Sequence, residues 1–203
     1  MTNSPAVPRK SPRRTADTNK LERSLGKLPD ASTVAALVVM TGLPGSGKSH
    51  FARLLAEHWP AVILDSDALR KVLFKTPAHS KREHQRLFPA MHELIDRLLS
   101  RGVSVIVDAT NLKEEHRGPY YAIAKRHRAR PVLIRTWAPK SVVKERLRNQ
   151  GSTIDGADRS TATLEVYERM SKDVERITLA HISVNTALPL DSALDNVLEQ
   201  LQS

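Results

Sequence analysis

The sequence predicts an α/β protein whose parallel sheet is covered by helices on both faces. From Ala35 onward, short apolar runs alternate with longer stretches of helical periodicity, which is the order of βαβ units. The apolar runs are rich in Val and Ile, as is typical of strands buried on both faces. A glycine-rich segment also follows the first run and precedes a helical stretch. These three observations favour a doubly wound fold.

Five apolar runs are the predicted strands of this sheet. They cover residues 36–40, 61–64, 103–107, 131–137 and 181–184. Helical periodicity covers residues 47–58, 67–73, 81–100, 113–128, 140–150, 161–177 and 192–201. Pro60 ends the first of these helices and Gly102 the third.

Length and composition bound the class of protein. A chain of 203 residues that is 40% hydrophobic is expected to form one core and one active site. The absence of cysteine excludes disulfides, thiolate metal sites and cysteine nucleophiles. No run approaches the ~20 apolar residues of a membrane span, and the N-terminus lacks the apolar core of a secretion signal. We therefore expect a cytoplasmic protein that contacts no membrane.

Residues 1–30 are predicted to be a basic disordered tail, separate from a domain over residues 31–203. Four prolines lie there among Ser, Thr and Arg, with little apolar periodicity. Residues 1–28 hold seven basic side chains against two acidic ones, so half of the formal charge of +10 lies in this segment. A solvated extension and an arm that contacts nucleic acid are both compatible with it, whereas the prolines oppose an amphipathic transit peptide.

A phosphate-binding loop is the strongest motif in the chain. The pattern G-x-x-x-x-G-K-[ST] is matched, between the first strand and the first helix, by Gly42, Leu43, Pro44, Gly45, Ser46, Gly47, Lys48 and Ser49. Glycines let successive backbone N–H groups point at phosphate oxygens, and the helix N-terminus adds partial positive charge. This loop, with the adjacent His50, is predicted to bind ATP, and the fold is then that of P-loop NTPases.

Two side chains of this region carry further expectations. Lys48 is expected to reach the β- and γ-phosphates, and the Ser49 hydroxyl is expected to bind Mg²⁺ together with Asp65. The loop alone does not distinguish transfer of phosphate to a substrate from transfer to water, because motor and switch ATPases share it.

Polar residues after the second strand form the predicted acceptor side. Asp65 and Asp67 follow this strand at its carboxyl end, where ligands bind in parallel sheets. Asp67 and Arg70 are three residues apart on one helix face. Asp67 could accept the proton of a hydroxyl, and Arg70 could hold the acceptor or the moving phosphoryl group. The alternative is a helix cap with a solvated arginine.

The third strand also ends in polar residues. Asp108 is placed to hold Arg70 or a water on Mg²⁺, and Thr110 and Asn111 are candidate substrate contacts. Capping of the following helix competes with the substrate role for Asn111.

Three segments carry a resemblance to a known family: residues 42–49, residues 67–70 and residues 108–111, which Arg117 follows. They resemble the polynucleotide-kinase-like, zeta-toxin-like group of P-loop kinases, the AAA_33 type. The resemblance covers about residues 38–185. It implies that Asp67 activates the acceptor hydroxyl, that Arg70 contacts phosphate and that Asp108 belongs to the active site. It also makes Arg117 a candidate for substrate binding.

A helical lid is expected after the fourth strand. Many nucleoside-monophosphate-like kinases, which this chain resembles, carry two lid arginines four residues apart that stabilise charge on the moving phosphoryl group. Arg146 fits the first position, but the second is Gln150. Arg148 and Arg159 are the candidates to compensate, and both are equally compatible with solvated surface positions.

The combined prediction is a kinase that transfers the γ-phosphoryl group of ATP, with Mg²⁺, to a hydroxyl. A polynucleotide 5′-hydroxyl is favoured by the resemblance and weakly by the basic tail. A small-molecule acceptor such as a sugar, nucleotide sugar or antibiotic fits the same scaffold. A regulatory module that binds ATP without catalysis stays open because of Gln150. Among the eight histidines, none with metal-ligand spacing, His79 and His84 are candidate substrate contacts.

Overall fold

A single parallel sheet forms the centre of the molecule. The computed structural model describes residues 11–149 and 163–202. Its strands are ordered β2-β3-β1-β4-β5, and every neighbouring pair is parallel. Their bounds are β1 (Ala36–Thr41), β2 (Val62–Asp65), β3 (Val105–Asp108), β4 (Arg130–Trp137) and β5 (Ile182–Asn185). The predicted five-stranded parallel sheet is confirmed, with ends displaced by one or two residues.

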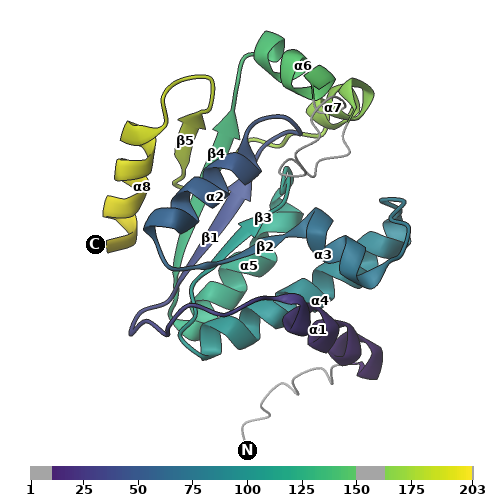
Figure 1. Cartoon of the computed structure of the whole chain (residues 1–203), viewed down its shortest axis with the longest axis vertical. Coiled ribbons are helices and arrows are strands. Elements are labelled where there is room, and N and C mark those ends of the chain that lie inside the picture. Colours follow the sequence, from purple (N-terminus) through teal and green to yellow (C-terminus); the bar gives the residue numbers. More distant parts are fainter. Residues whose placement is uncertain (1–10, 150–162, 203) are drawn as a thin grey trace, which may run out of the picture.

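Helices cover both faces of this sheet, as the sequence predicts (Figure 1). They are α1 (Pro12–Ser24), α2 (Lys48–His58), α3 (Ser66–Leu73), α4 (Lys81–Ser100), α5 (Glu114–His127), α6 (Lys140–Asn149), α7 (Leu164–Ser171) and α8 (Asp191–Gln202). None of the helices within residues 11–149 and 163–202 is long and apolar enough to cross a membrane.

The central strand β1 contributes to two separate cores. Leu37 and Val39 pack in the core that contains residues of α1, α3, α4 and α5. Val38 and Met40 pack in the core that contains residues of α2 and α8. Because successive strand residues point to opposite faces, an uninterrupted apolar strand needs a helical layer on each side.

The helices α6 and α7 form the lid over the carboxyl end of the sheet (Figure 1). The predicted helix over residues 161–177 is shorter in the structure, where α7 ends at Ser171. The segment after α7 bonds to the loop before α5 instead: Glu175 N donates to Leu112 O at 3.1 Å, and Glu114 N donates to the Glu175 carboxylate at 2.7 Å. These contacts replace further helical turns.

The prediction of disorder over residues 1–30 is wrong for residues 12–24, which form helix α1. Ser11 caps this helix, because its side chain accepts a hydrogen bond from Arg14 N, and Pro12 stands in the first turn, where a proline costs nothing. Only one apolar side chain of α1, Leu21, is fully buried. The polar composition therefore concealed the helix.

Ion pairs with α4 hold α1 in place of a wide apolar face. Asp17 is 5% exposed and accepts two hydrogen bonds from Arg86, at 2.7 and 2.6 Å. Arg14 donates to the buried Glu93 at 3.2 Å. Thr18 adds a hydrogen bond to the Ala90 carbonyl oxygen. Because bidentate guanidinium–carboxylate pairs are directional, they fix α1 against α4 in one register.

Candidate active site

The glycines of the phosphate loop are required by space as well as by conformation. Gly45 and Gly47 have φ values of 74° and 83°, which side-chain-bearing residues rarely adopt. A Cβ on Gly47 would lie 2.8 Å from Thr186 Oγ1, and one on Gly42 would lie 2.5 Å from the Thr136 carbonyl oxygen. The loop can therefore pack against β4 and the segment after β5 only with glycine at these positions.

Two threonines outside the motif, Thr136 and Thr186, hold the phosphate loop through hydrogen bonds to Ser46. Ser46 Oγ and Thr136 Oγ1 are 2.8 Å apart, and Thr186 Oγ1 donates to the Ser46 carbonyl oxygen at 2.9 Å. Lys48 is 9% exposed, and its Nζ donates to the Leu43 carbonyl oxygen at 3.0 Å, across the mouth of the loop. Sequence reasoning missed both threonines, since each lies at a strand end with no motif around it.

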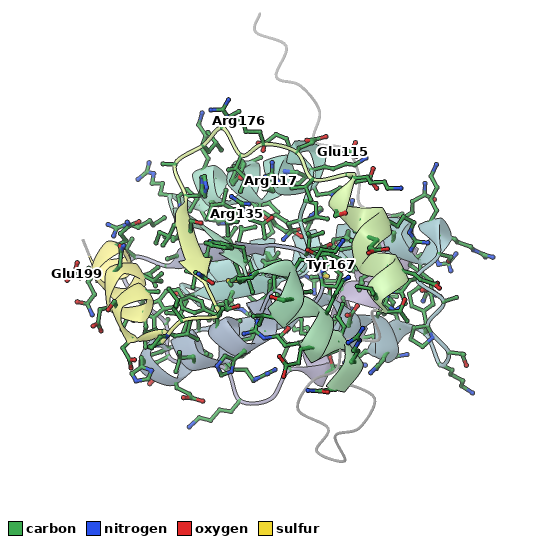
Figure 2. All side chains as sticks on the ribbon, turned by 90° about the horizontal axis from the view of Figure 1, so that it is seen from above. Glu115, Arg117, Arg135, Tyr167, Arg176 and Glu199 are labelled. Carbon is green, nitrogen blue, oxygen red and sulfur yellow. The ribbon has the colours of Figure 1, made fainter. Side chains whose placement is uncertain are left out.

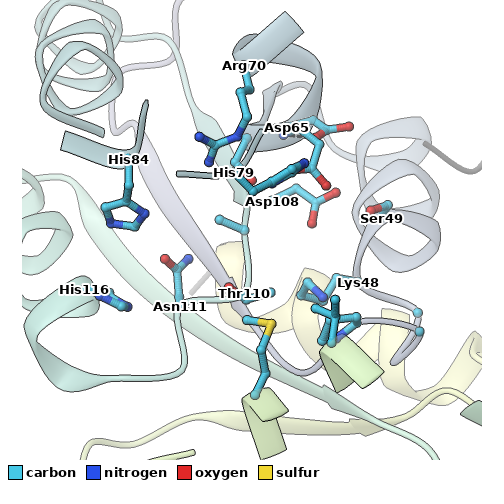
Figure 3. Close-up of a pocket in the computed structure, with 18 of the residues that line it drawn as sticks. Lys48, Ser49, Asp65, Arg70, His79, His84, Asp108, Thr110, Asn111 and His116 are labelled. Carbon is cyan, nitrogen blue, oxygen red and sulfur yellow. Dashed lines mark hydrogen bonds and ion pairs between the residues drawn. The ribbon is translucent and has the colours of Figure 1, made fainter. Parts of the chain in front are cut away.

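One cleft of about 830 Å³ joins the loop to the predicted acceptor residues. Lys48 and Ser49 lie on one side of it and Arg70 on another, with the carboxylates of Asp65 and Asp108 between them (Figure 3). Asp67 also lines the cleft. The strand register explains this grouping, because Asp65 of β2 is paired directly with Asp108 of β3.

Burial shapes the ionisation of the two carboxyl groups in the cleft. It raises the pKa of Asp108, against the opposing effects of Lys48 and of a hydrogen bond with Ser49. It also raises the pKa of Asp67, while the nearby His79 opposes the shift and Asp65 adds to it. Asp67 thus binds a proton more readily than an ordinary aspartate does, which suits a general base.

The residues at this point fit Mg²⁺, and the two neighbouring carboxylates, Asp65 and Asp108, differ in their contacts. Asp65 Oδ1 caps α3 by accepting hydrogen bonds from Asp67 N and Ala68 N at 2.8 and 3.1 Å. Burial raises the pKa of Asp108 and Ser49 opposes this shift, which places the Ser49 hydroxyl beside that carboxylate. Within the described residues no group of three or more His, Asp or Glu could hold a metal unaided. Magnesium commonly takes one or two protein ligands beside phosphate and water, so Ser49 and Asp108 suffice as protein donors.

Arg70 faces the cleft but is paired differently from the sequence expectation. It is 5% exposed, and its Nη1 lies 3.4 Å from an oxygen of Glu83 on α4, so that Glu83 holds it and not Asp108. Glu83 also accepts a hydrogen bond from Ala78 N at 2.9 Å, which is the main reason that its pKa is lowered. Arg70 Nε has no hydrogen-bond partner among the described residues. A buried donor of this kind is suited to an anionic ligand.

Thr110 and Asn111 line the cleft, whereas Arg117 does not. Asn111 has a φ of 45°, and its side-chain amide donates to the Met40 carbonyl oxygen at 2.9 Å, which ties this loop to β1. Arg117 is fully buried and donates to the Asn111 carbonyl oxygen at 2.8 Å. In Figure 2 it lies within the body of the molecule, while Arg176 is at the periphery. The structure corrects the predicted substrate contact: Arg117 supports the loop that carries Asn111.

The lid brings one expected arginine and one unexpected arginine to the cleft. Arg146 lines it and donates to the Gly45 carbonyl oxygen at 3.3 Å and to Thr186 Oγ1 at 2.8 Å. Arg148 is exposed and does not line the cleft, and Arg159 and Gln150 lie outside the described residues. Arg169 of α7 lines the cleft instead. No local motif marks Arg169, so only the placement of α7 reveals it.

Three ring side chains line the far end of the cleft: His84 and Phe88 from α4 and His116 from α5. The ring centroids of His84 and Phe88 are 4.1 Å apart, and those of His84 and His116 are 5.4 Å apart. His84 was a candidate from the sequence, but Phe88 and His116 were not. His79 also reaches the cleft, with Nδ1 3.9 Å from Asp67, and His50 lines it from α2.

A parallel sheet in the order 2-3-1-4-5, a glycine loop closing on a helix N-terminus and a helical lid define the P-loop kinase fold. Within that class the chain belongs to the AAA_33 family, described as an AAA domain, whose model matches residues 37–177. The expected resemblance to this group is confirmed.

Comparison with individual proteins supports the same fold. Chaetomium thermophilum Kti12, solved with ADP-AlF3, superimposes with a TM-score of 0.65 at 18% identity, over 81% of this chain and 98% of that one. The APS kinase CysC of Mycobacterium tuberculosis, solved with AMPPNP and APS, gives 0.60 at 20% identity, over 85% and 100%. Human NEDD4-binding protein 2 is 30% identical over 148 residues, which are 66% of this chain but only 8% of that protein.

Proposed function

We propose that this protein is an ATP- and Mg²⁺-dependent kinase that phosphorylates a hydroxyl group, with a polynucleotide 5′-hydroxyl as the acceptor. The observation that carries this proposal is the shared cleft: Asp67, with its raised pKa, opens onto the same space as the phosphate loop at Lys48. Nucleotide binding alone does not require a half-buried carboxylate in the cleft opposite the phosphate loop, whereas phosphate transfer to a hydroxyl requires a general base there.

The phosphate side supplies charge for the moving group. The loop amides and Lys48 hold the β- and γ-phosphates, and Arg146 and Arg169 approach from the lid. Mg²⁺, held by Ser49 and Asp108 when bound, neutralises charge on the phosphate oxygens. Transfer of this kind depends mainly on positioning and electrostatics.

The acceptor side supplies the base. The acceptor hydroxyl gives its proton to the Asp67 carboxylate as its oxygen bonds to the γ-phosphorus. The bond from that phosphorus to the β–γ bridging oxygen breaks, and ADP leaves with the electron pair. Arg70, held by Glu83, offers its guanidinium group to an anionic group of the acceptor.

A second hollow favours a polynucleotide over a small metabolite. It has a volume of about 760 Å³, lies between α1 and α4, and is lined by Arg13, Arg14, Arg82 and Arg86 and by the acidic Asp17 and Glu83. Arg86 is paired with Asp17 and Arg14 with Glu93. Glu83 also contacts Arg70, so this basic hollow adjoins the acceptor side of the cleft. Phosphates beyond a terminal nucleotide would find counter-charge at Arg13 and Arg82. A sugar or an aminoglycoside has no phosphate to place there.

The test is a transfer assay with Mg²⁺ and γ-labelled ATP on a 5′-hydroxyl oligonucleotide, beside a panel of sugars, nucleotide sugars and aminoglycosides. We expect label on the oligonucleotide 5′ end, lost in Asp67→Asn although that variant still binds nucleotide. Label confined to a metabolite would replace the acceptor assignment. Tight ATP binding with no labelled product at all would favour the regulatory module.

A further inference from the structure

The row of rings at the end of the cleft is a built surface that the phosphotransfer chemistry does not use. His84 and Phe88 lie one turn apart on α4, and His116 faces them from α5. All three are partly exposed, and all line the cleft. Figure 3 places His84 and His116 on the side opposite Lys48 and Ser49, with Arg70 and Asn111 nearer the middle.

A second row of rings supports the first from behind. His92, one turn further along α4, lies 6.5 Å from Phe88 and 5.0 Å from Tyr120 of α5, in an edge-on arrangement with Tyr120. Tyr120 is fully buried. Burial lowers the pKa of His92 to about 4, so this residue is a neutral packing ring at physiological pH. Because Phe88 packs against His92, less side-chain entropy is lost when a ligand binds to Phe88.

The pKa of His84 in the exposed row is also lowered, which favours its neutral form. Burial lowers the pKa of His84, and the adjacent His116 and Arg70 lower it further. A neutral imidazole beside a phenyl ring offers apolar ring faces together with a polar nitrogen. Such a surface suits a flat, polar-edged ring better than an alkyl chain or another cation.

We propose that His84, Phe88 and His116 form a subsite for the base of the acceptor's terminal nucleoside. The inference rests on the proposed kinase function and adds that the acceptor is recognised through an aromatic ring. The neighbouring Arg70 is then placed for the phosphate attached to the same nucleoside, and Asp67 for its hydroxyl. The subsite contacts the base by stacking, which tolerates different bases.

The test compares two 5′-hydroxyl oligonucleotides that differ only in whether the terminal nucleotide carries a base or is abasic. Binding is measured by calorimetry on the full chain loaded with Mg²⁺ and AMPPNP, and transfer is measured with Mg-ATP. We expect the wild type to bind the base-bearing oligonucleotide about tenfold more tightly, within the range of base–aromatic stacking. His84→Ala should remove this preference and His84→Phe should keep it, whereas His181→Ala, at an exposed histidine before β5, should change nothing.

The outcomes separate the subsite from the catalytic proposal. Transfer to both oligonucleotides with equal affinity would overturn the subsite and leave the kinase proposal standing. A base preference that His84→Ala removes, without any transfer, would support the subsite and reject the acceptor assignment. A base preference that survives in both His84→Ala and His116→Ala would place the base elsewhere and overturn the inference.

Discussion

The two sides of the cleft recognise their ligands in different ways. On the phosphate side a run of nine residues, 42–50, presents main-chain groups whose positions are fixed by β1, β4 and the segment after β5. On the acceptor side single side chains from α3, α4 and α5 converge, among them Asp67, His84 and His116. Recognition by main-chain groups depends on the backbone conformation of the fold, whereas recognition by side chains changes with single substitutions. Changes on the first side should abolish nucleotide binding, and changes on the second should alter the acceptor.

The largest effect is expected from Gly47→Ala. This substitution forces a Cβ into a position with positive φ and within 2.8 Å of Thr186, so the loop must move out of its phosphate-binding shape. Nucleotide binding measured by calorimetry should be lost. Gly118→Ala is the matched control, because no atom lies within 4 Å of its added Cβ and the site is helical; it should bind nucleotide normally. Normal binding by Gly47→Ala would mean that the loop does not hold the phosphates.

Substitutions in the lid test whether Arg169 of α7 stabilises the moving phosphoryl group. Arg169→Ala should lower kcat by about 10³-fold, because an arginine that stabilises the moving phosphoryl group has effects of that order. Arg148→Ala removes an exposed arginine outside the cleft and should leave kcat within a factor of two or so. Equal effects of the two substitutions, measured in a single-turnover transfer assay, would remove Arg169 from the mechanism.

The pH dependence tests the base. Asp67 accepts a proton only as the carboxylate, and burial raises its folded-state pKa, so transfer should decline with falling pH above the range of an ordinary aspartate. His79 opposes this shift. His79→Ala should therefore move the decline to higher pH. Asp67→Asn should lower kcat by about 10²-fold or more and abolish the dependence. If the pH profile of kcat/KM does not shift in His79→Ala, Asp67 is not the titrating group.

The smallest effect is expected from breaking the contact between Asp17 of α1 and Arg86 of α4, which holds the helix that carries acceptor-side residues. Asp17→Ala removes a bidentate partner of Arg86 and should lower the free energy of unfolding by about 1–3 kcal/mol, measured by urea denaturation. Because α1 packs along the helix that carries Glu83, His84 and Phe88, the KM for the acceptor should rise a few-fold at unchanged nucleotide affinity. A combined Asp17→Ala, Arg86→Ala variant measures the coupling. Independent effects of the two changes would assign α1 no role in holding α4.

The same contrast explains what the sequence could reveal. The phosphate loop is readable because its function lies in consecutive backbone conformations that only glycine adopts cheaply, and the strands are readable from their unbroken apolar runs. Helix α1 was missed because its partners, such as Arg86 and Glu93, lie about 70 to 80 residues further along the chain.

Other errors have the same origin. Asp108 was expected to hold Arg70, but the structure pairs Arg70 with Glu83 of α4, 13 residues further along the chain. Arg117 follows the loop that carries Asn111 and is an apparent substrate contact, but its side chain turns inward. Such roles depend on side-chain direction and on distant partners, which residue spacing does not encode.

The central claim is that the backbone of residues 42–49 and the Lys48 ammonium group bind a nucleoside triphosphate. Titration of Mg²⁺ and AMPPNP into the purified protein, followed by calorimetry, tests it most directly. The account predicts saturable heat with one nucleotide per chain, and an affinity at least about tenfold weaker in Lys48→Ala, because a charge-assisted contact with phosphate contributes roughly 1.5–3 kcal/mol. Saturation with equal affinity in both proteins, or no heat from the folded wild type, would contradict it.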